Sequence, residues 1–172
     1  MILRPEVLLH PNIPKTLHGI APRKILGDAW WNVERQKAYE STNYHCLACG
    51  VHKLKAKYHQ WLEAHEIYEY NYPKGRLIFK EIVPLCHACH NSIHTGRMRI
   101  LVKKGEMTDI KEQEILDHKY NILKINKLKE PKPPESCADW LDWRMVVFGK
   151  EYGPSTQNFQ EWKSGKWRLW KP

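Results

Sequence analysis

Two pairs of cysteines with metal-ligand spacing are the most specific chemical signal in the sequence. Cys46 and Cys49 form one C-x-x-C pair, and Cys86 and Cys89 form the second. Each pair can give two thiolates to one tetrahedral zinc ion. The chain between the pairs is longer than in a compact zinc ribbon, but a β-hairpin there would bring the pairs together. We therefore predict one structural zinc ion held by four cysteines.

The alternative for these cysteines is two unconnected redox or buried-thiol motifs. Neither pair is surrounded by the βαβ pattern of a thioredoxin-like domain. The sequence also shows no secretion signal, which predicts a cytoplasmic protein whose thiols stay reduced. The fifth cysteine, Cys137, belongs to neither pair, and we expect it to be an ordinary, partly buried thiol.

Three histidines could form a second metal site. His65 lies late in an expected strand, while His90 and His94 stand at i and i+4 on one face of an expected helix. The alternative is that the helical pair only faces solvent or forms hydrogen bonds in the core. His90 directly follows Cys89, so a cysteine that binds zinc would also fix the position of this imidazole. We expect the three histidines to share one divalent ion.

The elements that must position these residues follow from the pattern of the chain. A strand is expected over residues 58–68, and its antiparallel partner over 76–85 is rich in β-forming residues. The run over 86–97 then has helical spacing, and Gly96 favours an early end. Strand, strand, helix is therefore the expected order around both candidate sites.

One further helix is expected before the strand, strand, helix segment and one after it. One covers about residues 29–40 and follows Asp28, a good N-cap residue. The other begins after Thr108 and runs to about Leu128. Its apolar stripe, which we expect to pack on the core, comprises Ile115, Leu116, Tyr120 and Leu123.

Prolines and composition divide the chain into three expected parts. Residues 1–27 hold several prolines and predict an extended basic arm, and 28–128 form the main domain. Residues 129–172 are expected to be a proline-rich linker and a small aromatic-rich unit. The tryptophans of that unit would form either a small core or a surface for a protein partner, and they are Trp162, Trp167 and Trp170.

About residues 30–99 resemble the HNH endonucleases, also called ββα-metal or His-Me finger nucleases. The resemblance rests on the first C-x-x-C pair, the run W-L-E-A-H-E-I and the run I-V-P-L-C-H-A-C-H-N-S-I-H. It implies an α+β fold with a ββα-metal core on a four-cysteine zinc staple, and hydrolysis of phosphodiester bonds in nucleic acid. It also implies that His65, His90 and His94 hold one catalytic divalent ion, which could be Mg²⁺, Mn²⁺, Ni²⁺ or Zn²⁺.

The sequence departs from the family pattern at two positions. Glu81 stands where the family has its middle asparagine, which mostly steadies a loop. Glu66 stands where the family usually has a general-base histidine, and we expect it to act as the base or to orient the attacking water. The alternative function is a zinc-ribbon module that binds nucleic acid or a protein partner without catalysis.

The charge of the chain favours a polyanionic partner. Lys and Arg outnumber Asp and Glu by 28 to 19, which gives a formal net charge of +9. Basic proteins bind nucleic acid by releasing counterions from phosphates, and DNA is expected here more than RNA. No stretch approaches the roughly 20 apolar residues of a membrane helix. The expected phosphate contacts are Arg23, Lys24, Arg35, Lys37, Arg97 and Arg99.

Overall fold

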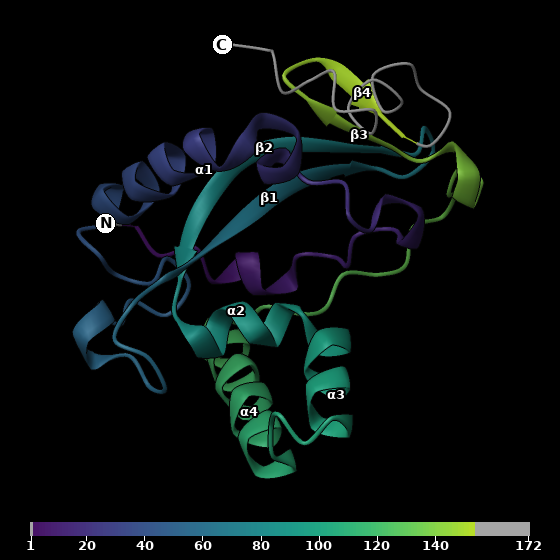
Figure 1. The fold of residues 1–172 in the computed structure, drawn as a ribbon. Coiled ribbons are helices and arrows are strands. Elements are labelled where there is room, and N and C mark those ends of the chain that lie inside the picture. Colours follow the sequence, from purple (N-terminus) through teal and green to yellow (C-terminus); the bar gives the residue numbers. More distant parts are fainter. Residues whose placement is uncertain (1, 154–172) are drawn as a thin grey trace. The chain divides into compact units, whose positions relative to one another are not determined.

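The computed structural model describes residues 2–153 and gives them an α+β fold, as predicted (Figure 1). A mixed sheet within this range has the strand order β1-β2-β3-β4. Strand β2 pairs with β3 in parallel, and β3 pairs with β4 in antiparallel orientation. The strands are β1 (Glu63–Asn71), β2 (Arg76–Leu85), β3 (Arg144–Val147) and β4 (Lys150–Tyr152).

The chain divides into two compact units, and each unit is built from three separate stretches. The first unit comprises the chain up to Asn12, Arg35–His65 and Ile82–Pro131. The second comprises Ile13–Glu34, Glu66–Glu81 and the chain from Lys132 onward. Each unit therefore takes one part of the β1–β2 hairpin, and all the candidate metal ligands named above belong to the first.

Three α-helices of the first unit lie together at the bottom of Figure 1. They are α2 (His87–Ile93), α3 (Thr95–Lys103) and α4 (Asp109–Ile125). Helix α4 begins where predicted, because the Thr108 side chain accepts a hydrogen bond from the Lys111 amide at 3.1 Å. Ile115 and Leu123 of its predicted stripe are buried, but Tyr120 is exposed.

The single helix expected over 86–97 is in fact two. Helix α2 ends at Ile93, and His94 leaves the helical conformation with φ −94° and ψ 52° before α3 begins. This break changes the direction of the chain, so that Ile93 and Met98 are both buried. Gly96 therefore lies near the start of α3 and does not end a helix.

The N-terminal arm is more structured than predicted. It contains two short 3-10 helices, Pro5–Leu9 and Lys15–Leu17, and α1 already begins within it and spans Pro22–Ser41. The chain departs from helical geometry at Gly27 (φ 89°), so the part that follows corresponds to the helix predicted over 29–40. The arm is ordered because it buries apolar side chains, among them Leu8, Leu17 and Ile25.

Strand β1 begins at Glu63, later than the predicted residue 58. Tyr58 has a φ of 78°, a left-handed conformation that a strand cannot contain. Strand β2 has the predicted limits. In the second unit the hairpin contributes to an apolar core that contains Leu17, Ile20, Ile25, Tyr68, Leu77, Trp143, Met145, Val147 and Tyr152.

No helix within residues 2–153 combines the length and the apolar character needed to cross a membrane. Trp162, Trp167 and Trp170 lie outside the described residues, so the expected aromatic unit stays a prediction.

Candidate metal centres

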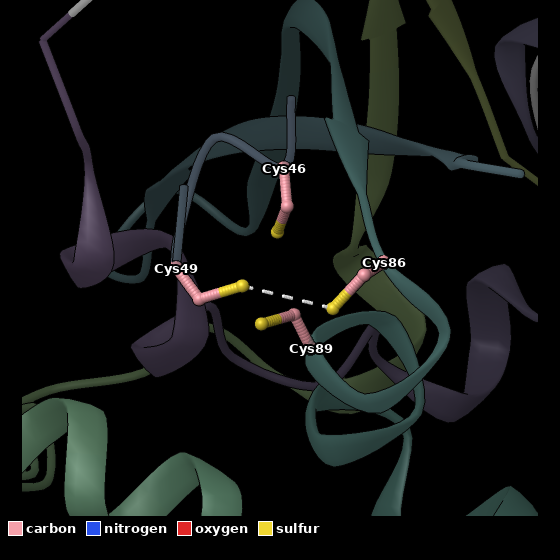
Figure 2. Close-up of side chains that lie close together, drawn as sticks. All are labelled: Cys46, Cys49, Cys86 and Cys89. Atoms are coloured by element: carbon pink, nitrogen blue, oxygen red, sulfur yellow. Dashed lines mark hydrogen bonds between the residues drawn. The ribbon is translucent and has the colours of Figure 1, made fainter. Parts of the chain in front are cut away.

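The four cysteines of the two C-x-x-C pairs point their sulfur atoms at one place (Figure 2). Their Sγ atoms lie within 4.8 Å of one another, and those of Cys49 and Cys86 are 3.8 Å apart. A tetrahedral zinc site with bonds of about 2.3 Å places its sulfurs about 3.8 Å apart, far beyond the roughly 2 Å of a disulfide. All four thiols are free. The cluster, hereafter the cysteine cluster, therefore fits the predicted structural zinc ion.

Local hydrogen bonds shape the first half of the cysteine cluster. The amide of Gly50 donates to the carbonyl of Cys46 at 2.9 Å, and Gly50 adopts a φ of 76° that favours glycine. The amide of Leu47 donates to the carbonyl of Pro84, also at 2.9 Å, and so joins the turn to β2. The second pair lies at the junction between β2 and α2. The hairpin therefore brings both pairs together, as the sequence predicted.

The pKa values of the four thiols indicate that the cysteine cluster needs a cation. Hydrogen bonds from Cys49, Cys86 and Cys89 hold the pKa of Cys46 far below its ordinary value. Hydrogen bonding with Cys46 raises the pKa of Cys86 and of Cys89 in turn. One thiolate can therefore form at the expense of its neighbours. Four thiolates, of which three are buried and that of Cys49 is half-buried, need a positive ion among them.

A histidine that no sequence pattern identified lies beside this cluster. Nε2 of His118 in α4 is 3.4 Å from Sγ of Cys89. The two residues are 29 positions apart, so their proximity depends on how α4 packs against α2. Cys137, by contrast, is exposed and not partly buried as predicted.

His65, His90 and His94 lie together in the first unit, and we call them the histidine centre. One ligand nitrogen from each lies within 4.8 Å of the other two. The ring centroid of His65 is 5.4 Å from that of His90 and 5.1 Å from that of His94. Strand β1 supplies the first imidazole, helix α2 the second, and the α2–α3 junction the third.

Burial keeps two of these imidazoles neutral. It lowers the pKa of His65 to about 2, and the neighbouring His90 and His94 add to this effect. Burial also lowers the pKa of His94 to about 4. The Nδ1 atom of His65 is buried without a hydrogen-bond partner among the described residues. Neutral imidazoles with a free nitrogen are suited to bind a divalent ion, so the three residues fit the predicted ligand set.

Two residues near the histidine centre were missed at the level of sequence. A carboxylate oxygen of Glu63 lies 2.5 Å from Nδ1 of His90, at an angle unfavourable for a hydrogen bond. Nδ1 of His10, from the N-terminal arm, lies 3.4 Å from Nε2 of His65. Glu63 stands two positions before His65 on β1, and this period-two spacing is a signal that could have identified it. No comparable signal marks His10.

The pKa of Glu63 reflects its two imidazole neighbours. Burial alone would raise this pKa, but contacts with His87 and His90 outweigh burial and hold it well below its ordinary range. The carboxylate is therefore ionised. Such a carboxylate beside a ligand imidazole fixes the orientation of the ring and raises its basicity as a ligand.

The remaining predicted site residues have varied surroundings. Glu66 directly follows His65 on β1, and its charge contributes to the raised pKa of Tyr68, which is mainly due to burial. Glu81 lies in β2. Asn91 is buried in α2 and donates to the backbone carbonyl of His87 at 2.9 Å. Because neighbouring strand residues face opposite sides, Glu63 and His65 share one face and Glu66 points to the other.

The six basic residues predicted to contact phosphate are divided between the two units. Arg23 and Lys24 belong to the second unit, whereas the other four belong to the first. Arg23 pairs with Asp28 at 2.9 Å, and Arg99 pairs with the buried Glu112 at 2.8 Å. Arg97 is exposed, and its charge is one cause of the lowered pKa of His94, after burial and His90. Arg35 forms a hydrogen bond with Tyr39 that partly offsets the rise in the tyrosine's pKa on burial, and Lys37 lies in α1.

The described residues thus contain a four-sulfur cluster and a three-imidazole centre on one strand, strand, helix framework. The first is suited to hold a structural ion, and the second can leave coordination positions for a ligand. No protein-family model matches the chain, and comparisons with curated proteins and with solved structures found no match.

Proposed function

We propose that this protein is a metal-dependent endonuclease that hydrolyses phosphodiester bonds in nucleic acid, DNA more than RNA. The observation that carries the proposal is the convergence of His65, His90 and His94 on a hairpin and helix next to the cysteine cluster. Binding of nucleic acid alone needs no three-imidazole centre. The resemblance of residues 30–99 to HNH endonucleases supports the same reading.

In this proposal the cysteine cluster holds the framework and the histidine centre holds the catalytic ion. A divalent ion there would act as a Lewis acid for the charge that develops on the phosphate and on the leaving 3′ oxygen. His65 and His94 are neutral because they are buried, and so need not lose a proton to serve as ligands. The carboxylate of Glu63, which lies beside Nδ1 of His90, would orient this ring as a ligand.

Two carboxylates of β1 have different proposed roles. Glu66 follows His65 and points to the other face of the strand, so its role is proposed from the family position alone: it takes the proton of the attacking water or orients that water. Glu63 acts on the site through His90 and is a positioning residue. Glu66→Gln should therefore lower the cleavage rate by roughly 10² to 10⁴ without weakening metal binding. Glu63→Gln should instead weaken metal binding by roughly 10- to 100-fold.

Phosphate recognition by the first unit is proposed to centre on Arg97. This side chain is exposed and acts electrostatically on His94, so it would place positive charge near the reacting phosphate. Contacts of this kind position the backbone of the nucleic acid and carry no sequence information. Arg99 is a weaker candidate than expected, since its guanidinium already pairs with Glu112.

The test is to incubate the zinc-loaded protein with supercoiled plasmid, single-stranded DNA and RNA. Each substrate is tested with magnesium, manganese or nickel and with a chelator that spares the cysteine cluster. The proposal expects nicked or linear plasmid only when a divalent ion is present. Binding of nucleic acid without cleavage of any substrate, under every metal condition, would contradict the proposal. It would favour the alternative, a zinc-ribbon module that binds nucleic acid without catalysis.

A further inference from the structure

We propose that His59, Glu63 and His87 form an additional binding site for a divalent transition-metal ion, which we call the His-Glu-His centre. One ligand atom from each of these residues lies within 4.8 Å of the other two. Two imidazoles and one carboxylate are a ligand set that proteins use for zinc, iron and related ions. This inference goes beyond the proposed nuclease function and does not depend on it.

Three nearby elements hold these residues in place. His59 lies in the loop before β1, Glu63 is the first residue of β1, and His87 is the first residue of α2. Nδ1 of His87 lies 2.7 Å from a carboxylate oxygen of Glu63. The rings of His59 and His87 stand nearly perpendicular, at 79°, with centroids 4.2 Å apart. The three groups are therefore already assembled before any ion binds.

The contact between His87 and Glu63 marks the place of the ion. Nδ1 of His87 lies 2.7 Å from a carboxylate oxygen of Glu63, so an ion bound to both atoms would take the place of the proton between them. The imidazole then carries its proton on Nε2, which is buried and has no hydrogen-bond partner among the described residues, so an ordered water is expected to pair with it.

The third ligand is oriented by a tryptophan. The ring of His59 stacks on Trp61 with centroids 4.1 Å apart and an angle of 8° between the planes. The stacking restricts rotation of the imidazole and so lowers the entropic cost of placing it as a ligand. Trp61 is 56% exposed, so this side of the His-Glu-His centre faces solvent. An ion there would keep coordination positions for water or a small anionic ligand.

The kind of ion follows from the donors. Magnesium and calcium prefer sites made of oxygen atoms, and this centre offers two nitrogens and a carboxylate. Zinc, cobalt and nickel suit imidazole ligands better. The absence of thiols also separates it from the cysteine cluster, because a cobalt ion at the two sites would have different absorption spectra.

Glu63 joins the His-Glu-His centre to the histidine centre. One of its oxygens contacts His87 at 2.7 Å, and the other lies 2.5 Å from His90. An ion that fixes Glu63 would also fix the orientation of His90. Binding at one centre should therefore strengthen binding at the other, and by thermodynamic linkage the effect must be reciprocal.

The experiment titrates cobalt into the full-length protein whose cysteine cluster is filled with zinc, and follows binding by calorimetry and visible absorption. The wild type should bind two cobalt ions per chain. His59→Phe, which keeps the stacked ring but removes the ligand, should bind one. His94→Ala should also bind one, and the double variant none. His18→Phe, at an exposed histidine of the second unit, is the matched control and should bind two.

Two results would overturn the inference. One is a wild type that binds a single cobalt ion which His94→Ala removes, and the other is a His59→Phe protein that binds two. His59→Gln serves as the second variant, and its thermal unfolding checks that the fold is intact. Cleavage activity is not read in this experiment. A protein that binds two cobalt ions but cuts nothing would contradict the nuclease proposal alone.

Discussion

Nε2 of His118 lies 3.4 Å from Sγ of Cys89, so helix α4 reaches the cysteine cluster although it contributes none of the four thiols. An ionised thiolate can only accept hydrogen bonds, and an imidazole N–H is a good donor to it. Such a contact draws charge from the sulfur and fixes its direction toward a bound ion. The proximity of these two residues therefore links the packing of α4 to the stability of the proposed zinc site.

This relationship predicts that His118→Ala weakens zinc binding without abolishing it. Loss of a hydrogen-bonding neighbour of a metal ligand typically costs 10- to 100-fold in affinity, and we expect roughly that range here. Competition with a chromophoric chelator measures the change. Gln113→Ala, at an exposed position on the same helix, should leave zinc affinity as it is. Equal affinities in the two variants would show that the contact is incidental.

A second prediction concerns the cysteine cluster itself. The purified protein should carry one tightly held zinc ion, and Cys46→Ser should lose that ion and unfold the first unit, since structural zinc sites supply folding energy directly. Elemental analysis and circular dichroism measure the two effects. Cys137→Ser, which removes the exposed thiol, is the control and should change neither. Zinc-free protein with a fully folded first unit would speak against the assignment.

The third prediction separates two arginines of helix α3. Arg99→Ala leaves the buried carboxylate of Glu112 without its ion-pair partner, whereas Arg97→Ala removes only an exposed charge. Because the Arg99 side chain is itself 64% exposed, we expect a loss of about 1 to 2 kcal/mol in the free energy of unfolding, less than for a fully buried pair. Urea unfolding measures it. Arg97→Ala should keep the free energy of unfolding and weaken nucleic-acid binding. If instead Arg97→Ala lowers the stability and Arg99→Ala weakens only the binding, the roles assigned to the two arginines are wrong.

A fourth prediction follows from the second-unit core. Burial raises the pKa of Tyr68 above its ordinary value, so the folded state retains this proton at a pH where the unfolded chain loses it. The stabilising contribution is complete below about pH 10 and is lost as the pH rises further. Urea midpoints at pH 8 and pH 11 should therefore differ less in Tyr68→Phe than in the wild type. Tyr120→Phe, at an exposed tyrosine, should retain the wild-type difference.

The parts of the fold with local signals could be predicted from the sequence. Strand β2 and the start of α4 at Thr108 were placed correctly, because alternating β-formers and an N-cap residue act within a few positions. The α2–α3 break at His94 was not predicted, since the burial of Ile93 and Met98 on either side of it depends on the tertiary structure. The helices of the N-terminal arm were not predicted either, because they depend on the burial of apolar side chains such as Leu8 and Leu17.

The candidate sites show the same division. Spacing within the chain selected the cysteines and the three histidines that the structure brings together. Glu63 could have been found from its period-two relation to His65, whereas the family pattern pointed to the adjacent Glu66. His10 and His118 approach their partners only through contacts between distant segments, and neither carries a local pattern.

The most direct measurement of the central claim is the rate of plasmid cleavage by zinc-loaded wild type and by His94→Ala at saturating manganese, with zinc content and folding shown to be equal. Because the three imidazoles are proposed to hold the catalytic ion together, loss of one should lower the rate by at least about 10²-fold. The account predicts metal-dependent cleavage by the wild type and almost none by the variant. Equal rates for the two proteins, or cleavage by the wild type that survives complete removal of the added ion, would contradict it.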